Sequence, residues 1–211
     1  MEKVIKERFY HIHRTLDNFN RQNKHSGKWV VGNTICVPNL PEDKNSLFER
    51  VSGLSFDLEK EKRNINHCFH ALKYFNQSTP DIQNRFLQNS LIGDNLQLVR
   101  ELILENVRLA TYPDHPSRMT GIWLASKQSI KDNWQETLGH INSKTFLVEL
   151  TGKIHRADAR WIVSNTLSFE TYFNNAIGYW NGVSFDNQGK FEEEYICEGT
   201  LKVISEVDIS E

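Results

Sequence analysis

Cysteine is scarce in this sequence: its 211 residues include only Cys36, Cys68 and Cys197, and no CxxC pair occurs. An odd number of isolated thiols argues against a disulfide framework and fits a reduced compartment. Long apolar runs are missing as well, since no stretch approaches the roughly 18 residues that a membrane span needs. The opening residues, MEKVIKERFYHIHR, carry charges where a secretory signal has its apolar region. These absences predict a cytoplasmic protein without a membrane segment.

Repeats, low-complexity tracts and long Pro/Gly/Ser linkers are also absent, which predicts a single domain over residues 1–211. A hydrophobic share of 38% is enough to bury a core. With 25 basic and 27 acidic residues the net charge is −2, which excludes a strong polyelectrolyte and does not identify a partner. Neither GxGxxG nor GxxxxGKS/T occurs, so a conventional phosphate-binding loop is excluded.

Periodicity predicts a mixture of helices and strands. Branched and aromatic residues predict extended chain at 9–13, 28–32, 34–37, 121–125, 145–150, 194–197 and 201–204. Apolar residues at three- and four-residue steps predict helices over about 42–93, 96–109, 129–138 and 169–179. In the helix at 96–109, the charged residues Arg100, Glu101, Glu105 and Arg108 fill the face opposite the apolar one. The strands are too irregularly spaced for a doubly wound sheet, so the expected fold class is α+β.

Three segments, in this order, resemble core strands of the ADP-ribosyltransferase superfamily, in its branch with a His, a Tyr and a Glu. They are Tyr10-His11-Ile12-His13, Gly121-Ile122-Trp123-Leu124-Ala125 with the Ser-containing segment after it, and Glu194-Tyr195-Ile196-Cys197. Ile12 and His13 replace a small and a hydroxyl residue of the family pattern, and Trp123 replaces its tyrosine. The branch includes poly-ADP-ribose-polymerase-like and bacterial toxin-like enzymes.

The resemblance covers about residues 8–37 and 96–208, and residues 146–152 are similar to a further core strand of the family. It implies a split mixed or antiparallel sheet, with residues 42–93 as a helical insertion. The stretch from Pro116 to Gly182 also resembles a family of uncharacterised bacterial proteins that we place in this superfamily.

The resemblance implies NAD as substrate and assigns a role to each site residue. Glu194 would stabilise the oxocarbenium-like state that forms when the bond from nicotinamide to ribose breaks. His11 would hold a ribose hydroxyl, the backbone of Ile12 the carboxamide, and Trp123 the nicotinamide ring. Arg118 would clamp the pyrophosphate. His13 and Arg14 complete the NAD-binding set, and no residue is assigned to a metal.

The acceptor would be positioned by Glu192 and by the turn-rich segment 183–191 just before Glu194. The resemblance implies RNA or DNA as acceptor in preference to protein, and the context of a toxin, controlled by an antitoxin, or of phage defence. Two other functions stay open at this point. One is an RNA 2′-phosphotransferase-like enzyme, and the other is a non-enzymatic module that binds ADP-ribose or a partner.

Simpler interpretations compete with several of these assignments. His11 and Trp123 also fit as core residues, Glu194 as a solvated carboxylate, and Arg118 as a member of a surface salt bridge. His67, Cys68 and His70 lie at helical spacing but lack a second ligand pair, so no metal site is predicted there. Aromatic and basic residues between 64 and 86 fit single-stranded nucleic acid or, equally, an ordinary amphipathic helix.

Overall fold

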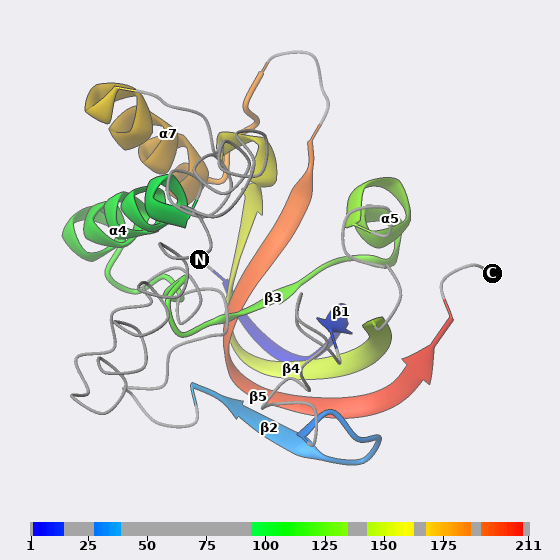
Figure 1. The fold of residues 1–211 in the computed structure, drawn as a ribbon. Helices are drawn as coiled ribbons and strands as arrows, with labels where there is room; N and C mark the ends of the chain where they lie inside the picture. Colours follow the sequence, from blue (N-terminus) through cyan, green and yellow to red (C-terminus); the bar gives the residue numbers. More distant parts are fainter. Residues whose placement is uncertain are drawn as a thin grey trace, which may run out of the picture.

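The computed structural model describes residues 2–14, 28–38, 94–134, 143–162, 168–186 and 191–208, and it has an α+β fold (Figure 1). Its five-stranded sheet consists of β1 (Glu2–Arg14), β2 (Thr34–Val37), β3 (Ile122–Leu124), β4 (Ser143–Asp158) and β5 (Glu193–Val207). The main helices are α4 (Asp94–Thr111) and α7 (Phe169–Asn181), and α5 (Lys127–Ser129) and η4 (Ala159–Trp161) are short. The predicted fold class is confirmed. The helical insertion predicted at 42–93, with His67, Cys68 and His70, lies outside the described residues.

The strands close into a ring around the main core. The pairings among the described strands are all antiparallel: β1 with β4, β4 with β5, and β5 with both β3 and β2. The ring closes where Tyr10 and Ala125 exchange two backbone hydrogen bonds of 2.9 Å, because these join β1 to the end of β3. Inside lie apolar side chains from every strand, including Phe9, Val148 and Leu201.

Two opposed glycines let the long paired strands β4 and β5 approach each other closely. Gly199 has φ 141, a conformation that side chains with a Cβ rarely adopt, and it faces Gly152 across the pair. A Cβ on Gly199 would overlap the carbonyl oxygen of Thr151, and one on Gly152 would overlap that of Glu198. β5 pairs with β3 before Gly199 and with β2 from Gly199 onward.

Helices α4 and α7 pack against each other beside the upper part of β4 in Figure 1. They bury a second core that includes Leu104, Val107, Tyr179 and Trp180 together with Ala157 of β4. The predicted helices at 96–109 and 169–179 are both confirmed.

The predicted faces of α4 are partly wrong. Ile103 and Val107 are buried as expected, but Val99, Leu102 and Leu109 are exposed, while the four charged residues expected opposite them are buried. Burial of ionic groups is stable only when each has a partner of opposite charge. The two arginines pair with glutamates of the same helix, and the two glutamates also bind Arg118 and Ser117 in the segment after it, contacts that the helical period does not reveal.

Other boundaries also differ from the prediction. The extended chain predicted at 28–32 is wrong, because residues 31–32 form a turn that brings Gly32 and Asn33 into hydrogen bonds of 2.9 Å with Val203 of β5. The helix predicted at 129–138 is instead α5 followed by the π-helical turn η3 (Ile130–Trp134), and 135–138 lie outside the described residues. The strands predicted at 194–197 and 201–204 form one strand, β5. Among the described residues, no helix is long and apolar enough to cross a membrane.

The close approach of β4 and β5 at the two glycines predicts that Gly199→Ala strongly destabilises the fold. The added Cβ meets backbone rather than a movable side chain, so we expect a loss of about 3 kcal/mol or more in the free energy of unfolding. Gly32→Ala is the matched control, because Gly32 also has a positive φ of 92 but nothing lies within 4 Å of its added Cβ. The control should cost only about 1–2 kcal/mol. Urea denaturation of both variants measures this difference, and equal losses of unfolding free energy would contradict the close approach of the two strands.

Candidate functional site

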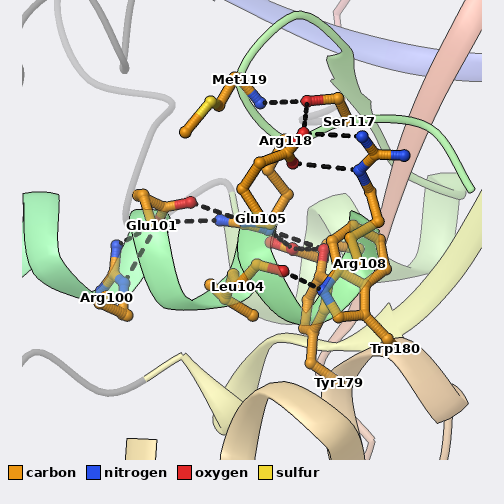
Figure 2. Close-up of polar contacts among 11 residues, drawn as sticks. Arg100, Glu101, Leu104, Glu105, Arg108, Ser117, Arg118, Met119, Tyr179 and Trp180 are labelled. Atoms are coloured by element: carbon orange, nitrogen blue, oxygen red, sulfur yellow. Dashed lines mark hydrogen bonds and ion pairs between the residues drawn. The ribbon is translucent and has the colours of Figure 1, made fainter. Parts of the chain in front are cut away.

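A buried arginine stands at the centre of the candidate site. The Arg118 side chain, only 3% exposed, follows α4 and precedes β3. Its Nε donates to Oε2 of Glu101 at 2.8 Å, and its Nη1 donates to Oε1 of Glu194 at 2.5 Å and to the Tyr179 hydroxyl at 2.7 Å. One guanidinium group therefore joins α4, α7 and β5. Figure 2 shows Arg118 with Glu101 of α4 and Tyr179 of α7.

The charges in this interior balance. Arg100 also donates to Glu101, at 2.7 Å, so two guanidinium groups stand against two carboxylates. Burial raises the pKa of Glu101, but Arg118 and Arg100 outweigh this effect and lower the pKa below its ordinary value. Burial keeps the pKa of Tyr179 well above its usual range, so its hydroxyl stays protonated and donates to Oε1 of Glu194 at 2.5 Å.

A second buried ion pair fixes the segment that carries Arg118. Arg108 pairs with Glu105 at 2.7 Å and donates to the carbonyl oxygens of Pro113 and His115 at 3.1 and 2.9 Å. The Ser117 hydroxyl donates to Glu105 at 2.9 Å, as Figure 2 shows. The turn before β3 is thereby tied to α4, which orients Arg118 towards the sheet.

The structure brings Trp123 and Glu194 together around Arg118, as the sequence predicted for these two residues. The guanidinium carbon of Arg118 lies 5.5 Å from the centroid of the Trp123 ring and 4.9 Å from that of Tyr179. Trp123 is half-buried and lies opposite Ile196 on the neighbouring strand, two residues from Glu194. Since alternate residues of a strand share a face, these side chains lie on the same face of the sheet.

His11 lies on the other face. Its ring stacks on Trp29 with centroids 3.9 Å apart, within the core that also holds Phe9. Phe9 in turn contacts Tyr195. Tyr195 is the neighbour of Glu194 on β5, and its side chain points to the opposite face of the sheet from that of Glu194. The link from His11 to the candidate site runs through the backbone, because its Nδ1 is 2.9 Å from the carbonyl oxygen of Trp123. Burial lowers the pKa of His11 to about 4, so the ring is neutral at pH 7 and Nδ1 carries the donated proton.

The remaining first-strand residues divide between the two faces. His13 is buried and stacks on Trp29 with centroids 5.4 Å apart, on the side of His11. Ile12 packs with Ala125 and Ile130 on the other side. The side chain of Arg14 lies outside the described part of the chain, so its role stays a prediction.

Asp158 organises the segment before Glu194, and the sequence prediction missed it. Its carboxylate, buried completely, accepts hydrogen bonds from the backbone N–H groups of Phe185 at 3.0 Å and Glu192 at 3.2 Å. It also pairs with Arg160 at 2.6 Å, and Arg160 reaches Asp186 at 2.7 Å. Both ends of the segment 185–192 are therefore fixed to the end of β4, while residues 187–190 lie outside the described part. An Asp two residues before an Arg is too common a pattern to have signalled this.

The central ion network predicts a large, pH-dependent effect of Arg118→Met. Removing the guanidinium leaves Glu101 and Glu194 buried without their main partner, which should cost about 3–5 kcal/mol of unfolding free energy at pH 7. Glu101 has a lowered pKa, so its ion pairs stabilise the fold above the ordinary glutamate pKa, and that stabilisation is lost as the pH falls below it. The difference between wild type and variant should therefore shrink below about pH 4.5.

Arg156→Met is the matched control for this experiment. Arg156 also pairs with a glutamate, Glu193, at 2.6 Å, but its side chain is 54% exposed. An exposed pair contributes about 0–1 kcal/mol, so this variant should lose little at any pH. Chemical denaturation between about pH 2.5 and 8 tests both variants, and a loss for Arg118→Met no larger than for the control would contradict the network.

Comparison with known proteins gives a family. A model of the family described as "Protein of unknown function (DUF2441)" matches residues 9–209. A search of the curated proteins finds no match. Residues 9–209 include the described part of every strand from Phe9 onward, the buried Arg118 network and the segment held by Asp158, and on this match the chain belongs to the DUF2441 family.

Proposed function

We propose that this protein transfers ADP-ribose from NAD to a macromolecule, with Glu194 as the catalytic carboxylate. The observation that carries the proposal is the state of this one side chain. Oε1 of Glu194 is held by Arg118 and Tyr179, whereas Oε2 accepts no hydrogen bond within the described part of the chain. A fixed carboxylate with one unused oxygen, close to an aromatic ring, suits stabilisation of a cationic transition state.

The proposed reaction exchanges one bond at the ribose C1′ atom for another. The bond from C1′ to the nicotinamide nitrogen breaks, and its electron pair leaves with nicotinamide, which becomes neutral. A nucleophilic atom of the acceptor attacks C1′ and loses its proton to solvent. Positive charge develops on the ribose between these events, and the negative charge of Glu194 stabilises it. Trp123 would offer its half-buried ring to the nicotinamide.

The geometry supports a positioning role for Arg118 and His11. Arg118 fixes Glu194, and His11 fixes the carbonyl of Trp123, so both act on the two residues proposed to touch NAD. The pyrophosphate contact of Arg118 and the ribose contact of His11, expected from the sequence, stay predictions.

A non-enzymatic binding module is the second candidate, and one observation favours it. Glu194 is only 6% exposed, and an ion pair with Arg118 also satisfies a purely structural carboxylate. The two candidates differ in one measurable product, since only the enzyme releases nicotinamide from NAD.

Glu194→Gln should separate chemistry from stability. The amide keeps the shape of the side chain but removes its charge, so nicotinamide release should fall by roughly 10²-fold or more. Glu101→Gln is the matched control, because it removes the other carboxylate paired with Arg118 without changing the proposed catalytic group. The control should lose far less activity than Glu194→Gln, and the two variants should have similar thermal stability. Equal activity losses in both variants would remove Glu194 from the chemistry, and a wild type that releases no nicotinamide with DNA, RNA or protein would favour the binding module.

The acceptor is proposed to be nucleic acid, positioned by Glu192 and the segment 183–191. Glu192→Ala should abolish ADP-ribose transfer and leave slow hydrolysis of NAD, because water can replace an acceptor that is no longer held. Asp158→Asn should shift the balance in the same direction, since Asp158 holds the backbone N–H of Glu192 at 3.2 Å. Nicotinamide release and incorporation of labelled ADP-ribose into DNA, RNA and protein are measured in parallel. Equal losses of both activities in Glu192→Ala would contradict the acceptor role of Glu192. Labelling of protein alone would mean that the acceptor is protein and not nucleic acid.

A further inference from the structure

A cavity of about 540 Å³ lies away from the Glu194 carboxylate, at the edge of β4. β1 pairs with β4 as far as Glu2 opposite Ile154, whereas β4 continues to Asp158, so within the described part of the chain the edge of β4 beyond Ile154 has no partner strand on the side of β1. The ends of α4 and α7 reach this edge, where Tyr112, Asn181 and Gly182 line the cavity. Its volume is in the range of pockets that hold small molecules.

Flat rings form one wall of the cavity. The rings of Tyr112 and His115 stack with centroids 5.1 Å apart, and those of His115 and His155 stack with centroids 4.5 Å apart. The ring centroids of His155 and Trp180 are 5.1 Å apart. Burial lowers the pKa of His115 to about 4 and that of His155 to about 3, so both imidazoles are neutral at pH 7. Because His115 is stacked between Tyr112 and His155, and Trp180 lies against His155, the half-buried Tyr112 ring ends the stack, and neither histidine adds positive charge to the wall.

Two carboxylates face the same space because β1 contains a bulge. Glu2 and Glu7 both line the cavity although they are five residues apart, a spacing that in a regular strand puts side chains on opposite faces. The pairing with β4 shifts between Val4 and Glu7, and Lys6 at the bulge has φ 55. A non-glycine residue in this conformation costs about 1–3 kcal/mol and often marks a functional site. Neither Glu2 nor Glu7 forms an ion pair within the described part of the chain.

The arginine of the cavity is already neutralised. Arg156 pairs with Glu193 at 2.6 Å, and its guanidinium carbon lies 4.4 Å from the centroid of the Phe191 ring. The end of α7 adds partial negative charge, since the C-terminus of a helix is the negative end of its dipole and α7 has no basic residue in its last turn. The polar groups of the cavity therefore favour positive charge.

We propose that this cavity binds a small organic cation, an amidinium, guanidinium or ammonium group on a flat or short apolar body. The carboxylates of Glu2 and Glu7 attract the charge, and the Tyr112 ring at the end of the stack offers a π face to the cation. The site goes beyond the proposed transfer reaction and does not depend on it. Its carboxylates repel the pyrophosphate of NAD, so the site is separate from the one proposed for that substrate.

Benzamidine and acetophenone are the probes that test the charge requirement, because they have nearly the same planar shape, differ in charge at pH 7, and neither is a carboxamide like nicotinamide. Ligand-observed NMR titration of the intact protein should give an affinity for benzamidine at least about tenfold above that for acetophenone. Excess NAD should not displace benzamidine. Equal affinities for the two probes would overturn the proposal, and displacement by NAD would overturn the separation of the two sites.

Variants locate the binding. Glu2→Gln with Glu7→Gln should weaken benzamidine about tenfold, whereas Glu170→Gln, at an exposed carboxylate in the first turn of α7, should leave the affinity unchanged. Tyr112→Leu should weaken binding about threefold, and Tyr112→Phe, which keeps the aromatic face, should not. Each variant is first checked by circular dichroism and thermal melting. Unchanged affinity in the folded double glutamine variant would overturn the proposal, whatever the outcome of the NAD assays.

Discussion

Neutralisation of one buried guanidinium is the constraint on which the rest of the structure depends. Arg118 is almost without contact with water, so it needs carboxylates at hydrogen-bonding distance, and these come from α4 and β5. Tyr179 of α7 supplies a third contact. The two main helices and the strand that carries Glu194 are therefore positioned relative to each other by ionic contacts as well as by apolar packing. The same contacts hold one oxygen of Glu194 and leave the other unused.

Local patterns in the sequence predicted where the helices and strands lie better than they predicted which of their faces are buried. The period of α4 and α7 and the apolar runs of β4 and β5 were sufficient to place these elements and the fold class. The buried face of α4 was not predictable from its own residues, because its charged side chains are buried by partners such as Arg118 and Ser117, about ten to twenty residues later in the chain. The turn at 31–32 depends similarly on contacts with Val203.

The candidate site was predictable in part for a related reason. Trp123 and Glu194 lie on paired strands, so motif order was enough to bring them together. Which face a residue takes depends on register and bulges, and this is why His11 contacts Trp29 and the backbone of Trp123 instead of Glu194. Glu101, Tyr179 and Asp158 were missed because each acts through contacts with residues well separated from it in the sequence.

The hold of Asp158 on Phe185 and Glu192 has a consequence for how members of this family can diverge. Both ends of the intervening segment are anchored to the end of β4 by the same carboxylate. We expect insertions, deletions and substitutions between the anchors to leave the register of β5, and hence the position of Glu194, unchanged. The length and composition of this segment can then change between members of the family while the buried carboxylate stays in place.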